Sequence, residues 1–365
     1  ELERGPRLEP ERFVVALKYD RLEPRAVGDV RKLDSITGYV AFHQFTVDAH
    51  EQLRAAFRRL LREQHARQVV LDLRRNPGGD LAAAVRVAAA FFPERTLVFR
   101  SEGRRPATDR EFRTDRDGEF RDVPLVVLID ERTASAAEAL AGSLQDHDRA
   151  LVLGRRSFGK ALIQQLLPVP PAGDAVWLTT ARVVTPSGRV IQRSYRGLNA
   201  EQYFSQGGRA GAEADTLRVY RTAAGREVRG GGGIAPDVPL PAPPGIPVWL
   251  SVAADSGFDH AVADSVAATL PATPGARTAW LDASDEWRLR LVPPFLSRVR
   301  SRLGVAAAAD SALERLIARH LAARVADVRW GPDARDELLV RSDPDVRAAR
   351  TYFARLGTLL AGSAR

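Results

Sequence analysis

A serine placed between an apolar run and a helix-forming run is the first residue whose position suggests chemistry. Residues 125–129 are continuously apolar, which is typical of a buried strand, and Ser135 follows shortly after them. The residues after Ser135 are strong helix formers, so the sequence predicts this serine at the amino end of a helix. Unpaired backbone N–H groups and the positive end of the helix dipole meet there, and both stabilise an oxyanion. Ser135 is therefore a candidate nucleophile, with a simple helix cap as the alternative.

A lysine that follows Phe158 and Gly159 offers a base for that serine. An amine accepts a proton only when it is neutral, whereas an exposed lysine, with a pKa of about 10.4, is almost wholly charged at neutral pH. An apolar neighbour and a flexible glycine permit a dry pocket, in which desolvation lowers the pKa of a lysine. We therefore predict Lys160 as the general base, and a solvated surface lysine is the alternative.

The segments around these residues alternate between strand and helix patterns. The predicted order is strand 12–17, strand 38–45, helix 49–65, strand 69–73, helix 81–92, strand 125–129, helix 134–145 and strand 150–153. The turn Asn76-Pro77-Gly78-Gly79 ends the third of these strands. Strands that alternate with helices and are apolar on both faces indicate a sheet covered by helices.

The second half of the chain changes character twice. Strand patterns at 163–167 and 176–184 precede a polar, glycine-rich stretch at 193–233, and the Pro-rich connector 236–247 resembles a domain boundary. Residues 249–365 have mainly helical spacing. We predict a mixed α/β (α+β) core over 35–240, with a β-rich segment, and a helical C-terminal domain over 248–365.

The amino-acid composition argues against several classes of function. Hydrophobic residues make up 45% of the 365 residues, as in a globular protein, and no apolar run is long enough for a transmembrane helix. The net charge of +8 comes from scattered arginines without a basic, aromatic-interleaved strip, which disfavours nucleic acid as a partner. Cysteine is absent, and so is the HExxH pattern, so we expect neither a metal nor another cofactor.

Five motifs in order give the chain a resemblance to a known family. They are VVLDLRRNPGG (69–79), PLVVLIDERTASAAE (124–138), LQDHDRALVLGRRSFGKALIQ (144–164), TPSGRVIQ (185–192) and GGGGIAPDV (230–238). In these motifs the chain resembles the C-terminal processing peptidases, also called tail-specific proteases, which are serine/lysine endopeptidases. The resemblance implies a serine endopeptidase that cleaves proteins or peptides near their C-terminal tails.

The resemblance also implies roles for individual residues. Ser135 would be the nucleophile, Lys160 the base, and Gln164 the residue that orients the lysine. It further implies an oxyanion hole made by the backbone N–H of Ala136 and one from Gly78 or Gly79, a choice that the sequence leaves open.

Two further expectations follow from the resemblance. Residues 13–27 resemble the last part of a PDZ module, so residues 1–34 would be the end of that module and a linker, with most of the module upstream of Glu1. The family is exported, so we expect a periplasmic or cell-envelope location and protein substrates, and the oligomeric state stays open.

The chain departs from the family pattern at two positions beside the lysine. Ala161 stands where the family usually has glycine, and Arg155 stands where an acidic residue is common. Neither change removes a catalytic group. We expect the positive charge of Arg155 to lower the pKa of Lys160 further.

Three alternatives compete with the serine/lysine reading. Residues 154–160 fit the first seven positions of a phosphate-binding P-loop, but Ala161 replaces the Ser or Thr that would hold magnesium, and a strand pattern follows. His147 lies between two aspartates and would suit a Ser-His-Asp triad, yet no GxSxG elbow is present, and we interpret it as a residue of a helix end. The third alternative is an inactive peptide-binding scaffold.

Overall fold

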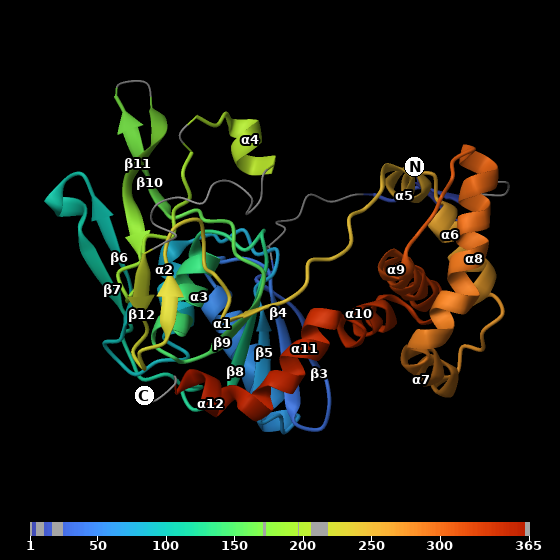
Figure 1. Cartoon of the computed structure of the whole chain (residues 1–365), viewed down its shortest axis with the longest axis horizontal. Helices are drawn as coiled ribbons and strands as arrows, with labels where there is room; N and C mark the ends of the chain where they lie inside the picture. Colours follow the sequence, from blue (N-terminus) through green and yellow to red (C-terminus); the bar gives the residue numbers. More distant parts are fainter. Residues whose placement is uncertain are drawn as a thin grey trace.

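The centre of the molecule is a six-stranded sheet with helices on both faces (Figure 1). The structure, a computed structural model, describes residues 2–4, 11–16, 25–170, 173–195, 197–205 and 218–361. From one edge to the other the strands are β14 (Val238–Pro239), β9 (Leu151–Gly154), β8 (Leu125–Ile129), β5 (Gln68–Asp72), β4 (Thr37–Phe42) and β3 (Val27–Lys32). All neighbouring pairs are parallel except β3 with β4. The carboxyl ends of β5, β8 and β9 therefore share one edge, and the loops with the candidate residues start there.

Helices from the first half of the chain cover one face of this sheet. They are α1 (Ala49–Arg58), which continues as a π-helical turn (Arg59–Glu63), α2 (Leu81–Ala88) and α3 (Ala136–Asp146). Leu53 and Phe57 of α1 and Leu140 of α3 are fully buried in the shared apolar core. The helical stripe of apolar residues thus has a sheet to pack on, which stabilises both elements.

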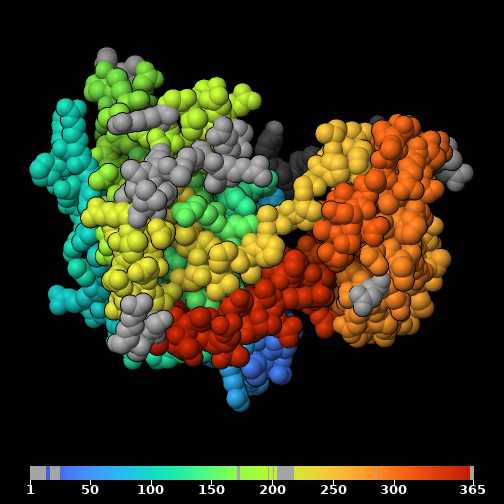
Figure 2. All heavy atoms as spheres, in the orientation of Figure 1, coloured from blue at the N-terminus to red at the C-terminus, as the bar shows by residue number. Residues whose placement is uncertain are grey.

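The opposite face is covered by the end of the chain. Val346, Ala349 and Leu356, from α11 (Pro344–Tyr352) and α12 (Leu356–Leu360), pack on Val70 and Leu128 of the sheet. Figure 2 shows this last segment, in red, running from the helical region along the core. The central strands are apolar on both faces because each face has its own helical cover.

A second sheet forms the β-rich part of the core. Its order is β10 (Leu162–Val169), β11 (Asp174–Val184), β6 (Leu97–Gly103) and β7 (Arg110–Arg113), with a 3-10 turn at Pro106–Thr108. The hairpin β10–β11 projects from the body of the core (Figure 1). Shorter elements are α4 (Ala200–Ser205) and the two pairs β12 (Val219–Arg221) with β13 (Glu227–Arg229) and β1 (Leu2–Arg4) with β2 (Glu11–Phe13).

The chain then forms a separate helical region with its own apolar core (Figure 1). Its helices are α5 (Val248–Asp255), α6 (Phe258–Ala267), α7 (Pro274–Asp282), α8 (Ser284–Leu303), α9 (Ser311–Trp330) and α10 (Pro332–Arg341). Trp280, Trp287, Leu291 and Phe295 are buried at its centre. Within the described residues, no helix has the length and apolar character needed to cross a membrane.

The predicted fold class is confirmed at the coarse level: a mixed α/β core, a β-rich segment and a helical C-terminal region. The domain boundaries stay predictions. The helices after residue 343 pack on the core sheet, so the predicted unit 248–365 contains helices that contact two different cores. Of the predicted PDZ segment, residues 17–24 lie outside the described part of the chain, and no PDZ module is evident in the part that is described.

Candidate active site

Ser135 lies where the loop after β8 enters α3, as predicted. It is the residue before the first helical turn, and its backbone has a φ of 58° and a ψ of −119°. A positive φ is costly for a residue with a side chain, and such strain persists only where neighbours enforce it. The residue before it, Ala134, donates its N–H to the carbonyl of Asn76 at 2.9 Å. The turn at Asn76 therefore helps to hold the serine in this conformation.

A buried carboxylate joins the serine to the lysine. Glu138, three residues after Ser135, is fully buried. Its Oε2 accepts the backbone N–H of Ser135 at 2.9 Å and that of Lys160 at 2.8 Å. Its Oε1 accepts the hydroxyl of Ser157 at 2.5 Å and the N–H of Gly159 at 2.7 Å. One carboxylate thus fixes the backbones of both candidate catalytic residues, and their nitrogen atoms share one acceptor oxygen.

The environment of Glu138 shifts its ionisation. Burial raises the pKa of Glu138 to about 7, and the hydrogen bonds from Ser157, Lys160, Gly159 and Ser135 oppose that rise. Four donors around one carboxyl group match the ionised form, which only accepts hydrogen bonds. The loops therefore supply hydrogen bonds that suit the ionised carboxylate, although burial makes the ionised form energetically unfavourable.

The two glycines of the Asn76 turn have different surroundings. A Cβ on Gly78 would lie 2.7 Å from the Cβ of Ser135 and 2.9 Å from the nitrogen of Ala136, and the φ of Gly78 is 94°, so only glycine fits there. The N–H of Gly78 donates to Asn76 Oδ1 at 2.8 Å. Gly79 forms a parallel bridge with Phe45, in which the flanking residues make the hydrogen bonds and the N–H of Gly79 points away from Phe45.

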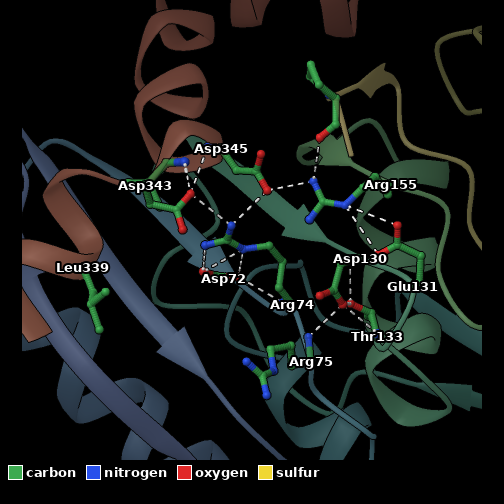
Figure 3. A network of polar contacts seen from close by, with 12 residues as sticks. Asp72, Arg74, Arg75, Asp130, Glu131, Thr133, Arg155, Leu339, Asp343 and Asp345 are labelled. Carbon is green, nitrogen blue, oxygen red and sulfur yellow. Dashed lines mark hydrogen bonds and ion pairs between the residues drawn. The ribbon is translucent and has the colours of Figure 1, made fainter. Parts of the chain in front are cut away.

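The loops after β5, β8 and β9 are joined by hydrogen bonds. Asp130 Oδ1 accepts the N–H groups of Arg75 at 2.8 Å and of Thr133 at 3.1 Å, as Figure 3 shows. The carbonyl of Thr133 accepts the N–H of Phe158 at 2.9 Å. Movement of one loop would break hydrogen bonds to the next, so the three loops form one unit.

Lys160 lies between β9 and β10 and is half-buried. The next residue, Ala161, donates its N–H to Gln192 Oε1 at 2.7 Å. Gln164 lies at a bulge in β10 and is exposed, and among the described residues its side chain has no hydrogen-bond partner. The roles of Lys160 and Gln164 therefore stay predictions, and Gln192 is a new neighbour of the lysine.

The histidine and P-loop alternatives do not fit the local structure. His147 ends α3, where its Nε2 lies 2.7 Å from the carbonyl of Leu97. The 11 residues of α3 span about 16 Å and separate it from Ser135. The P-loop-like segment leads into β10 instead of a helix, and its N–H groups bind Glu138. Within the described residues, no three His, Asp or Glu side chains are grouped as metal ligands would be.

Arg155 was expected to act on Lys160 as a nearby positive charge. In the structure its guanidinium is paired with two acidic side chains. Its Nη1 donates to Asp345 Oδ2 at 2.8 Å, and its Nε lies 3.4 Å from Glu131. Both partners are acidic. The unusual charge at this position is therefore balanced by a carboxylate from the end of the chain.

The sequence-based interpretation did not single out Glu138, which contacts both candidate catalytic residues. The pattern Ser-x-x-Glu at 135–138 is the signature of a capping box, in which the glutamate takes the N–H of the residue before the helix. That signal would have placed the carboxylate beside Ser135. Its contacts with Ser157, Gly159 and Lys160 depend on how the loops fold together.

Part of the chain is similar to known peptidases. Residues 36–201 match the family described as Peptidase family S41. The carboxyl-terminal-processing protease of Synechocystis sp. is 37% identical over 186 residues, which are 50% of this chain and 42% of that protein. The carboxy-terminal-processing protease of Bartonella bacilliformis is 37% identical over 182 residues, 49% of this chain and 39% of that protein. The chain thus spans about two fifths of the length of these relatives.

The solved structure of a photosystem II D1 C-terminal processing protease is also similar. It is 26% identical, with a TM-score of 0.44 over 60% of this chain and 50% of that chain.

Proposed function

We propose that the protein is a serine endopeptidase of peptidase family S41, with Ser135 as nucleophile and Lys160 as general base, because residues 36–201 match that family. The observation that carries the proposal is the shared acceptor Glu138 Oε2, which receives the backbone N–H groups of both residues. Such an anchor keeps nucleophile and base in register, as a two-residue catalytic unit requires.

The reaction begins when the neutral amine of Lys160 takes the proton of the Ser135 hydroxyl. The serine oxygen then attacks the peptide carbonyl, and the carbonyl electrons move to the oxygen. The ammonium of Lys160 returns its proton to the departing amine as the C–N bond breaks, which leaves an acyl-enzyme. Water, deprotonated by the same lysine, releases the acid and restores the serine.

For the oxyanion we propose the N–H groups of Ala136 and Gly79. Ala136 is the first residue of α3, where backbone N–H groups lack intrahelical acceptors. The N–H of Gly78 is already bound to Asn76, whereas the N–H of Gly79 points away from its bridge partner Phe45. The second donor is therefore assigned to Gly79, and Gly78 serves as the close-packed support under Ser135.

The substrates we propose are proteins cut near their C-terminal tails. The support is the similarity to the carboxyl-terminal-processing protease of Synechocystis and the carboxy-terminal-processing protease of Bartonella. A PDZ module that holds such tails and an envelope location belong to the same proposal, and they rest on the resemblance alone. Fractionation of cells into cytosol and envelope tests the location, and protein found only in the cytosol would contradict it.

Mass spectrometry tests the activity directly. The protein is incubated with full-length candidate substrates, and the new termini are mapped, with Ser135→Ala as the control. Cuts near the tails that vanish in Ser135→Ala are expected. Binding of tails without any cut by the wild type would favour the inactive scaffold instead.

A further inference from the structure

One carboxylate oxygen from the end of the chain bridges two loops of the site. We call residues 343–361 the C-terminal arm, residues 74–79 the oxyanion loop and residues 155–160 the lysine loop. Asp345 Oδ2 accepts Nη1 of Arg74 at 2.9 Å and Nη1 of Arg155 at 2.8 Å (Figure 3). The first arginine begins the oxyanion loop, and the second begins the lysine loop.

Both arginines are tied to the loops beside them. The backbone N–H of Arg155 binds the carbonyl of Ile129, and its guanidinium meets Glu131 on the segment that leads to Ser135. The guanidinium of Arg74 is held by Asp72 at the end of β5, with 2.6 Å between Nη2 and Oδ2. If Asp345 shifted, Arg74 at the start of the oxyanion loop and Arg155 at the start of the lysine loop would either move with it or lose their partner.

Further ion pairs of the C-terminal arm connect these arginines to the helical region. Asp343 caps the start of α11, and its Oδ1 accepts Nη1 of Arg74 at 3.1 Å. Its Oδ2 accepts Nη2 of Arg319, in α9, at 3.2 Å. The ionic chain thus runs from α9 through the arm to both loops.

These charges are largely shielded from water. Asp345 is 7% exposed. Burial by itself would lower the pKa of Arg74 and of Arg155, but their carboxylate partners outweigh it and raise both. Removing one partner from such a cluster leaves a buried charge unpaired, which costs far more than the loss of an exposed ion pair.

We propose that Asp345 is a positioning residue, through which the C-terminal arm sets the distance between the oxyanion loop and the lysine loop. The proposal rests on the proposed function for its effect on catalysis. It also accounts for an arginine at position 155, because this chain supplies the matching carboxylate from its own end. The competing view is that the bridge only fastens the arm to the sheet.

The test compares two ion pairs of the same arm. Asp345→Asn removes the bridging charge with little change in volume. Arg350→Gln is the matched control, since Arg350 also lies in α11 and pairs with the core at Asp34, 2.9 Å away, but Asp34 lies before β4 and far along the chain from both loops. Arg155→Gln and the double variant with Asp345→Asn complete a double-mutant cycle.

Hydrogen exchange is measured first, because it needs no activity. In Asp345→Asn the amides of residues 74–79 and 155–160 should exchange about tenfold faster than in the wild type, and in Arg350→Gln they should not. Unchanged exchange in Asp345→Asn, or equal acceleration in both variants, would overturn the proposal. This result stands even if the wild type proves to have no peptidase activity.

Peptide cleavage then separates positioning from fastening. In Asp345→Asn the melting temperature should fall, because two buried arginines lose a partner. At temperatures where the variant stays folded, kcat should also fall about tenfold with KM nearly unchanged, and Arg350→Gln should match the wild type. The double variant should be no slower than the slower single variant, because both changes break the same bridge. A loss confined to melting temperature, or additive losses in kcat, would mean that the bridge only fastens the arm.

Discussion

The active-site loops and the helical region fill their interiors with different groups. Around Ser135 the buried groups include Asn76, Thr133 and Glu138, and each is hydrogen-bonded to another segment of the core. At the centre of the helical region the buried groups are mostly apolar, and even the indole nitrogen of Trp280 is satisfied within it, by the carbonyl of Ala322.

This contrast separates two uses of burial. Apolar packing is non-directional and tolerates small shifts, so it stabilises a fold without fixing atoms to a few tenths of an ångström. A buried carboxylate with four donors is costly but directional, because each donor left unpaired costs free energy. The buried polar groups of the active-site loops therefore lower the stability of the protein but fix the positions of the loop atoms. The described residues of the helical region include no candidate site whose atoms must be fixed in this way.

The largest expected effect separates the lysine from the histidine. Lys160→Ala should reduce peptide cleavage by roughly 10²- to 10⁴-fold or more, as expected when a general base is lost. His147→Ala should leave kcat within about threefold of the wild type, because His147 lies at the far end of α3 and contacts Leu97. Cleavage rates of both purified variants decide this. A dead His147→Ala with an active Lys160→Ala would refute the serine/lysine mechanism.

The second prediction concerns stability without activity. Trp287 is 3% exposed and donates from its indole nitrogen to the carbonyl of Trp280, so Trp287→Ala should destabilise the helical region by about 3–5 kcal/mol. Urea unfolding followed by tryptophan fluorescence measures this change. At temperatures where the variant stays folded, kcat should equal that of the wild type. A parallel loss of kcat would show that the helical region also shapes the site.

The third prediction uses the ionisation of Glu138. Its pKa rises from about 4.3 in the unfolded chain to about 7 in the folded protein because of burial. Between these values the folded protein binds one more proton than the unfolded chain, so the free energy of unfolding falls as the pH rises. In Glu138→Gln this slope is absent, and the wild type should lose on the order of 3 kcal/mol relative to the variant between pH 4 and 8.

The same variant tests what the stability cost achieves. In Glu138→Gln an NH₂ group replaces one of the carboxylate oxygens that accept the surrounding N–H groups, so kcat should fall about 100-fold at pH 8. Urea unfolding at both pH values and cleavage at pH 8 measure the two effects. A variant that gained stability and kept full activity would show that the carboxylate does not position the loops.

Local patterns predicted the part of the site that is close in sequence. Ser135 at a helix start and Lys160 before a strand both follow from runs of residues beside them. The pairing of Arg155 with Asp345 joins residues 190 positions apart, and no local pattern encodes which distant carboxylate meets a given arginine. The return of α11 to the sheet was missed for the same reason, since an amphipathic helix shows that it packs but not on what.

The smallest effect is expected at Gln164. It was predicted to orient Lys160 from its position four residues later, but it is exposed at a bulge of β10, whereas Gln192 binds the backbone beside the lysine. An exposed neutral side chain contributes about one hydrogen bond at most, so Gln164→Ala should lower kcat by about fivefold with the fold unchanged. Gln192→Ala is the comparison, because it leaves the N–H of Ala161 without its acceptor and should cost stability as well. Cleavage rates and melting temperatures of both variants test this difference. Wild-type turnover in Gln164→Ala would remove its role, and the orientation of the lysine would then depend on the buried contacts of Glu138 and Gln192 alone.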